Sequence, residues 1–182
     1  MFEKQPWMQR AGEYPRSDQE YFALLSRAVF SAGLGPKVVE SRWKEMGEAF
    51  HGFDPAGVKL MDEQDVARLL SDPGVIRNRR KIEAVIKNAG TFLEQVESVD
   101  GRAASGEAAF HTYLMDLGAG ADLDLAADGL AQVFTHLGRT SALFFLFSAG
   151  WRPHEINESI QVQAAIAEPA VDGAKRRSRV RT

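Results

Sequence analysis

A turn in the C-terminal third of the sequence has the composition of a phosphate-binding site. It reads Leu137, Gly138, Arg139, Thr140 and Ser141, and it separates two apolar segments that both read as helices. We expect the glycine to allow a backbone path that other residues avoid. The helix that follows would then offer its unpaired N–H groups, together with two hydroxyls, to a DNA phosphate. Such a contact holds a protein on DNA without reading the base sequence.

The same five residues also fit an ordinary helical hairpin, in which the glycine only ends the first helix. In that alternative Arg139 is a solvated side chain, whereas in the first interpretation it contacts a phosphate. The turn by itself leaves both interpretations open.

A second group of residues able to contact DNA is the basic run at 77–81, the densest in the body of the chain. We expect Arg77 and Arg79 to line the path of the phosphates, with a solvated helix start as the alternative.

The net charge is −3, but residues 175–182 hold five of the 22 basic side chains and no acidic one. The remainder is therefore acidic, which weighs mildly against a general nucleic-acid binder and still permits one local basic face.

The elements that must position these residues are all helices, because helix start signals are dense and strand signals nearly absent. The expected helices begin at Ser17–Glu20, run from Gly35-Pro36 to Phe50, begin at Asp54-Pro55, run from Asp62 to Leu70 and from Asn78 to about Val96, and then cover 107–117, 126–137 and 142–150. We predict a single all-α bundle of about seven to nine helices, with a helix-hairpin-helix element. Residues 1–167 form the domain, and residues 168–182 form a disordered basic tail that is a solvated arm or a non-specific DNA contact.

Composition also predicts what the chain does not carry. It has no cysteine, and its four histidines lack the spacing of a zinc site, so we expect neither a bound metal nor another cofactor. No signal peptide and no stretch of membrane-span length is evident, so we expect a soluble, cytoplasmic protein. We expect it to be a monomer.

Four segments, in this order, are similar to those of one known family: Ser31–Leu34, Phe50–Pro55, Met61–Val66 and Gly74–Ile82. Through them residues 14–156 resemble the bacterial DNA-3-methyladenine glycosylase I family, within the helix-hairpin-helix glycosylases. The resemblance implies an enzyme of base excision repair that flips alkylated adenine out of duplex DNA and removes it by hydrolysis, close to the nucleoid. It also implies that Gly33 and Leu34 lie against the DNA, with Leu34 filling the emptied base stack.

The chain departs from this family at positions that matter for the reaction. Ala28 stands where the family has a glutamate that binds the extruded base, and Pro36 stands where it has a tryptophan of the pocket wall. The zinc ligands that clamp the termini of family members are also missing.

An adenine methylated on N3 is already cationic, so its glycosidic bond is weak and stacking can supply much of the recognition. We expect the stacking residues to be Trp7, Tyr14 and Phe30, although each also suits an ordinary core. Glu155 is the candidate for a catalytic carboxylate. Two alternatives stay open: a non-catalytic damage-binding relative, and a glycosylase with another lesion preference.

Overall fold

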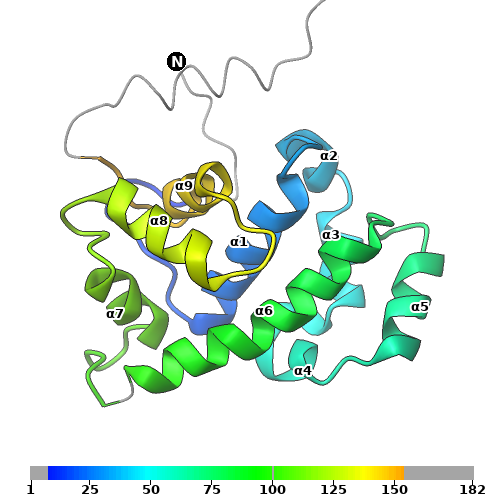
Figure 1. Cartoon of the computed structure of the whole chain (residues 1–182), viewed down its shortest axis with the longest axis horizontal. Coiled ribbons are helices and arrows are strands. Elements are labelled where there is room, and N and C mark those ends of the chain that lie inside the picture. The colour runs from blue at the N-terminus through cyan, green and yellow to red at the C-terminus, as the bar shows by residue number, and fades with distance from the viewer. Residues whose placement is uncertain (1–7, 100, 154–182) are drawn as a thin grey trace, which may run out of the picture.

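The computed structural model describes residues 8–99 and 101–153, and this part of the chain contains helices and no strand (Figure 1). In chain order the elements are α1 (Asp18–Ser31), α2 (Pro36–Glu40), α3 (Trp43–Ala49), the 3₁₀ helix η1 (His51–Phe53), α4 (Pro55–Lys59), α5 (Glu63–Ser71), α6 (Arg79–Ser98), α7 (Ala109–Asp116), α8 (Leu123–Val133) and α9 (Arg139–Ser148). The prediction of an all-α fold is confirmed. Trp7, Glu155 and the expected domain boundary at residue 167 lie outside the described residues.

Capping side chains fix most of the helix starts. Asp62 accepts from the N–H groups of Gln64 and Asp65, and the Asp65 carboxylate accepts from the N–H of Asp62, which completes a capping box for α5. At α1, where Ser17 and Glu20 have the spacing of a capping box, only half of the box forms. Ser17 accepts from the Glu20 N–H, but the Glu20 carboxylate accepts from the Arg16 N–H at 2.8 Å.

Two of the predicted helices differ clearly from the structure. The helix predicted from Pro36 to Phe50 is broken, because the Ser41 hydroxyl donates to the Val38 carbonyl at 2.9 Å and the chain turns before α3. The helix predicted at 126–137 both begins and ends earlier, at Leu123 and Val133, and Asp122 accepts from two N–H groups of its first turn. A stretch rich in glycine and aspartate therefore contains a helix cap as well as a connection.

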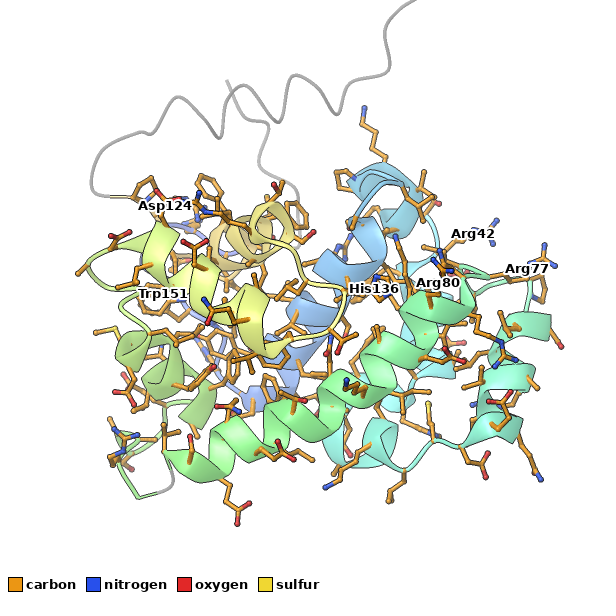
Figure 2. The ribbon with its side chains drawn as sticks, viewed as in Figure 1. Arg42, Arg77, Arg80, Asp124, His136 and Trp151 are labelled. Carbon is orange, nitrogen blue, oxygen red and sulfur yellow. The ribbon has the colours of Figure 1, made fainter. Side chains whose placement is uncertain are left out.

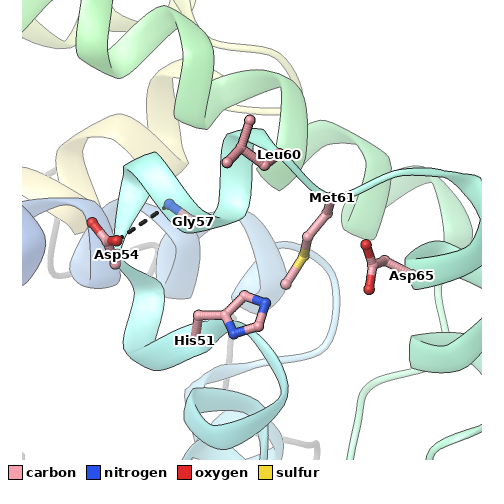
Figure 3. A pocket seen from close by; sticks show the side chains of 6 residues that line it. All are labelled: His51, Asp54, Gly57, Leu60, Met61 and Asp65. Carbon is pink, nitrogen blue, oxygen red and sulfur yellow. Dashed lines mark hydrogen bonds between the residues drawn. The ribbon is translucent and has the colours of Figure 1, made fainter.

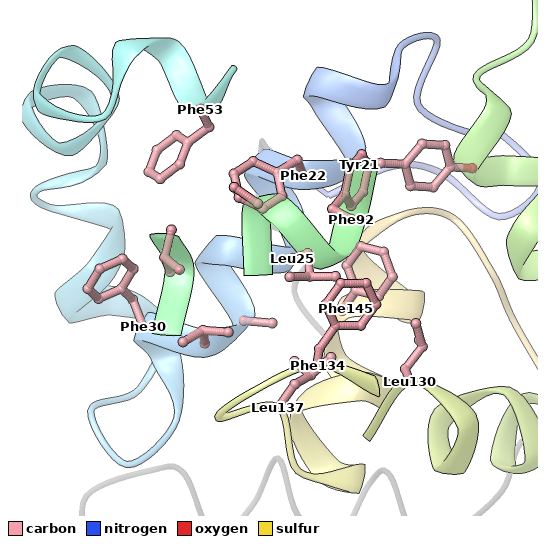
Figure 4. Close-up of a cluster of buried hydrophobic side chains, with 14 of the residues drawn as sticks. Tyr21, Phe22, Leu25, Phe30, Phe53, Phe92, Leu130, Phe134, Leu137 and Phe145 are labelled. Atoms are coloured by element: carbon pink, nitrogen blue, oxygen red, sulfur yellow. The ribbon is translucent and has the colours of Figure 1, made fainter. Parts of the chain in front are cut away.

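The core is built around α1, which packs against α2, α6, α7 and α9. A series of aromatic rings continues from α1 across the core. Phe22 contacts Phe92 at 5.3 Å between ring centroids (Figure 4), and Phe92 stacks on Phe110 at 4.2 Å. Phe145 of α9 closes the cluster, 6.3 Å from Phe110. All of these rings are buried, and they join the N-terminal helices to the C-terminal ones in one core.

The twenty residues of α6 cross the described part of the fold, with α5 beside its N-terminal end, α4 along its middle and α7 beside its C-terminal end (Figure 1). On its other side α8 packs against α9, and α9 packs against α1. Within residues 8–99 and 101–153, none of the helices combines the length and the apolar character that crossing a bilayer requires.

Two glycines give a test of this packing. Gly150, just after α9, has a φ of +95°, and a Cβ there would stand 2.1 Å from the Glu13 carbonyl oxygen. Gly138 has ordinary backbone angles and nothing within 4 Å of the corresponding position. We expect Gly150→Ala to lower the free energy of unfolding by on the order of 3 kcal/mol or more. Gly138→Ala is the matched control, with little change in urea denaturation. Equal denaturation midpoints for the two variants would contradict the packing of residues 10–13 on the end of α9.

Candidate nucleic-acid interface

The loop after α1 presents an exposed leucine between two glycines in left-handed conformations. Gly33 has a φ of 75° and Gly35 a φ of 80°, and the Leu34 side chain is 42% exposed. The N–H groups of Leu34 and Gly35 both donate to the Ser31 carbonyl, at 3.1 and 3.0 Å. Only glycine adopts such angles at low cost, so the two glycines let the loop turn tightly and leave Leu34 at its tip.

A lysine from α6 holds the start of this loop from inside the molecule. The Lys81 ammonium donates to the Phe30 carbonyl at 2.8 Å and to the Ala32 carbonyl, and only 8% of the residue is exposed. The last carbonyls of a helix carry partial negative charge, and α1 has no basic residue in its own last turn. Lys81 therefore supplies the missing cation, although the sequence showed it only as part of a basic run.

The turn between α8 and α9 differs from the expected path. Gly138 has a φ of −70° and a ψ of 166°, angles that any residue adopts, so the prediction of a glycine-only conformation there is wrong. The left-handed residue is His136, with a φ of 56°. Asn88 of α6 fixes the turn with two hydrogen bonds to the backbone of Thr135: it donates at 2.9 Å and accepts at 2.8 Å.

The N-terminus of α9 has the form that anion binding requires. Gly138 is its N-cap and makes no side-chain capping bond, and the first helical hydrogen bond runs from the Ala142 N–H to the Gly138 carbonyl. Thr140 is exposed and Ser141 is half-buried beside these groups. The N–H groups of the first turn therefore have no partner from the cap residue and point along the positive end of the helix dipole.

Two of the predicted phosphate contacts are already paired with carboxylates. Arg139 lies 2.8 Å from Asp124 and 3.0 Å from Asp128 of α8. Arg79 has two such partners as well, Glu63 and Glu83, and their hydrogen bonds raise the pKa of its guanidinium. All of these pairs are partly exposed, so each contributes little to stability.

Arg77 and Arg80 make no ion pair with any described residue. Figure 2 shows them with Arg42 where the N-terminal end of α6 lies beside α2 and α3. Helix geometry explains why Arg79 is paired and Arg80 is not. The residue four positions after Arg79 is Glu83, whereas the residue four positions after Arg80 is Ala84. The i, i+4 pattern could have indicated from sequence that Arg80 is the free arginine of this turn.

Of the described residues expected around a base pocket, Ala28, Phe30 and Pro36 lie at the C-terminal end of α1 and the start of α2, whereas Tyr14 precedes α1. Ala28 is 1% exposed, and Phe30 is fully buried with its ring 5.8 Å from that of Phe50. Pro36 is half-buried at the first position of α2, as its type predicts. Phe30 therefore serves the core here.

Next to Ala28 the chain buries an arginine that sequence reasoning overlooked. Arg27 is 1% exposed, pairs with Glu40 of α2 and places its guanidinium carbon 4.8 Å from the ring centroid of Trp43. Burial lowers the pKa of Arg27 to about 10. The signal was present in the sequence, since Arg27 interrupts the otherwise apolar part of α1.

Tyr14 belongs to an aromatic group at the other end of α1. Its ring is 4.6 Å from that of His111 and 4.5 Å from that of Trp151, and the Tyr21 hydroxyl is 3.0 Å from His111 Nδ1. Burial raises the pKa of Tyr21, the nearby Tyr14 raises it further, and the Trp151 indole opposes this. Trp151 is 3% exposed, and its N–H makes no aligned hydrogen bond within the described residues. Tyr14 is thus the exposed member of a stacked aromatic group.

A hollow of about 430 Å³ lies between η1, α4 and α5 (Figure 3). It is lined by His51, Asp54, Gly57, Leu60, Met61 and Asp65. Both of its carboxylates cap helix starts, since Asp54 accepts from the Gly57 N–H and Asp65 from the Asp62 N–H. Among the described residues no group of three histidine or acidic side chains is placed to hold a metal ion.

Residues 7–117 match the sequence model of the methyladenine glycosylase family. DNA-3-methyladenine glycosylase 1 of Escherichia coli K12 is 36% identical over 85 residues, which are 46% of this chain and 46% of that protein. DNA-3-methyladenine glycosylase of Haemophilus influenzae is 39% identical over 75 residues, which are 41% of this chain and 40% of that protein. The matched segments thus span less than half the length of these relatives.

Solved structures extend the likeness to most of the fold. A crystal structure of 3-methyladenine DNA glycosylase I is 27% identical with a TM-score of 0.65, and the match covers 81% of this chain and 90% of that one. The Staphylococcus aureus 3-methyladenine DNA glycosylase I is 23% identical with a TM-score of 0.68, and the match covers 86% of this chain and 91% of that one. The arrangement of helices is therefore the one these glycosylases have.

The aromatic group predicts a dependence of stability on pH. Burial lowers the pKa of His111 below its ordinary value, so the unfolded chain takes up this proton first as the pH falls. The contribution of His111 to the free energy of unfolding is therefore complete above about pH 6.5 and is lost as the pH falls below that value. We expect the free energy of unfolding, from urea titrations between pH 7.5 and 5, to fall more steeply for the native protein than for His111→Gln. His51→Gln, at an exposed histidine, is the control, and identical slopes for native protein and His111→Gln would show that His111 is not the group.

Proposed function

The chain belongs to the methyladenine glycosylase family, and on that premise we propose that it removes alkylated adenine of the 3-methyladenine type from duplex DNA. In this reaction water adds across the bond between the sugar C1′ and the base nitrogen, leaving a free base and an abasic sugar. The observation that carries the proposal is the family match over residues 7–117, which includes the loop after α1 and the basic start of α6. We infer that it acts on chromosomal DNA in the cytoplasm of a bacterial cell, because the relatives named above come from bacteria.

Contact with the DNA would come from two segments. The N-terminus of α9 would receive a phosphate, because its first N–H groups lack a cap partner and the helix dipole favours an anion there. The loop at 32–35 would approach the bases, since its glycines let the backbone come close and Leu34 projects from its tip. An apolar side chain in that place supports the gap left by a flipped base.

Arg77 and Arg80 would extend the phosphate contact from the start of α6. They are the arginines of the basic run that have no carboxylate partner in the described part of the chain. Arg79 and Arg139 would contribute only by giving up their ion pairs, and exposed pairs of this kind exchange at small cost.

The flipped base would be recognised mainly by stacking, because Ala28 brings no carboxylate to the pocket. A cationic methyladenine is attracted to the face of an aromatic ring and is already a good leaving group. Tyr14, 38% exposed, is the aromatic side chain of the described residues that supports this role. Trp7 and Glu155 remain predictions as stacking partner and carboxylate.

A second candidate function is damage binding without catalysis. Ala28 favours it, because a scaffold that binds DNA without the family carboxylate could recognise a lesion and leave the base attached. A glycosylase with another lesion preference is the third candidate, supported by the aromatic group around Tyr14.

Release of free base separates these candidates. We expect the full-length protein, incubated with randomly methylated duplex DNA, to release 3-methyladenine faster than a protein-free control at the same salt, as measured by mass spectrometry of the supernatant. Retained binding to methylated DNA without release would support the non-catalytic relative. Absence of release contradicts the proposed function in either case, and absence of binding as well would also exclude the non-catalytic relative.

The basic start of α6 gives a test of the DNA contact. We expect the double variant Arg77→Gln/Arg80→Gln to weaken binding to undamaged duplex. The slope of log K against log salt should become shallower by about 0.9 for each phosphate that the variant no longer neutralises. Arg79→Gln is the matched control and should change the slope less, because its guanidinium already faces two carboxylates. Equal slopes for the native protein and the double variant would place the phosphate path elsewhere.

A further inference from the structure

The buried side of α6 carries two polar side chains among apolar ones. Lys81 is 8% exposed and Asn88 is fully buried, while Ile82, Val85 and Ala89 around them belong to the hydrophobic core. Seven residues make about two turns of helix, so the two side chains leave the same side of α6 about 10 Å apart. Burying an ammonium and an amide costs free energy unless both find partners.

Both find those partners in backbone groups of loops. The Lys81 ammonium binds the carbonyls of Phe30 and Ala32, where α1 passes into the loop at 32–35. The Asn88 amide binds the N–H and the carbonyl of Thr135, directly before the left-handed His136 and the turn into α9. Neither side chain is exposed enough to contact a ligand on the surface.

These two loops are the segments assigned to the DNA in the proposed function, on which this inference rests. We propose that Lys81 and Asn88 are positioning residues that hold the loop at 32–35 and the turn before α9 at a fixed separation. The start of α9 can then bind a phosphate of one duplex while the loop at 32–35 contacts the site of the flipped base in the same complex. The element that separates the two loops is α6, a helix of twenty residues whose apolar face packs in the core. A displacement of about 1 Å at a reacting centre can cost a hundredfold in rate, so such a spacer acts on the flipping step more than on docking.

The test compares binding with turnover in variants of each anchor. Lys81→Met keeps the length and the apolar stem of the side chain and removes the donor. We expect the single-turnover release of 3-methyladenine to fall at least tenfold, with the Kd for undamaged duplex changed by less than threefold. Lys87→Met, at an exposed lysine of the same helix, is the matched control and should stay within twofold of the native protein in both measurements. A fall in rate matched by an equal loss of affinity would overturn the positioning role.

Hydrogen exchange on the protein alone tests the anchors without any activity. In Lys81→Met we expect the amides of Leu34 and Gly35 to exchange at least tenfold faster, because their acceptor at Ser31 lies in the turn that Lys81 holds. In Asn88→Ala we expect the same acceleration at Thr135, with the loop at 32–35 unchanged. Both variants are first checked for native helical content, and Lys87→Met again serves as the control.

The two measurements distinguish failure of the proposed function from failure of the positioning role. If the native protein releases no base, the proposed function fails, and faster exchange confined to the anchored loop still supports the anchors. If the native protein is active and both variants exchange and turn over as it does, the positioning role is overturned and the proposed function stands.

Discussion

The contacts on which the proposed DNA surface depends are two sets of buried hydrogen bonds from one helix. α6 binds the end of α1 through Lys81 and the turn before α9 through Asn88, and both partners are backbone groups. A helix is stiff along its axis because each residue is bonded to the turn before it, so the distance between the two loops follows from residue spacing alone. The aromatic core around Phe92 and Phe110 then keeps α6 in place against α1 and α9.

The sequence predicted the helices well because their signals are local. Asp62 predicted the start of α5, and Pro36 predicted the first position of α2. Where the predicted helix bounds are wrong, the cause is also a local contact, in which a polar side chain binds the backbone a few residues away. The Ser41 hydroxyl competes for the Val38 carbonyl and ends α2, and Asp122 caps α8 within a stretch that reads as a connection.

The functional surface was less accessible to sequence reasoning, because charge alone does not tell a buried cation from an exposed one. The run at 77–81 reads as one basic cluster, yet Lys81 faces inward, Arg79 is paired, and Arg77 and Arg80 make no ion pair among the described residues. The i, i+4 spacing reveals the Arg79–Glu83 pair, but the Arg79–Glu63 pair depends on how α5 packs beside α6. In the same way, the residue type predicted an unusual backbone conformation at Gly138, whereas the residue in the left-handed conformation is His136.

The departures from the family concern the base pocket more than the DNA surface. Ala28 is buried without a carboxylate, and beside it Arg27 forms an ion pair with Glu40 against the ring of Trp43. In the proposed function, a pocket without this carboxylate would offer less negative charge to a cationic base, so recognition would shift toward stacking. The loop at 32–35, which Lys81 anchors, has two glycines in left-handed conformations and an exposed leucine, so binding of DNA can be tested separately from the choice of lesion.

The most direct test of this arrangement is hydrogen exchange of the full-length chain, free and bound to a duplex that contains an abasic-site analogue. We predict slower exchange in the complex at residues 32–36 and 136–142 together, because one duplex contacts both loops, and unchanged exchange in the hollow at residues 51–65. Protection confined to that hollow, or to one loop without the other, would contradict a DNA surface organised by α6.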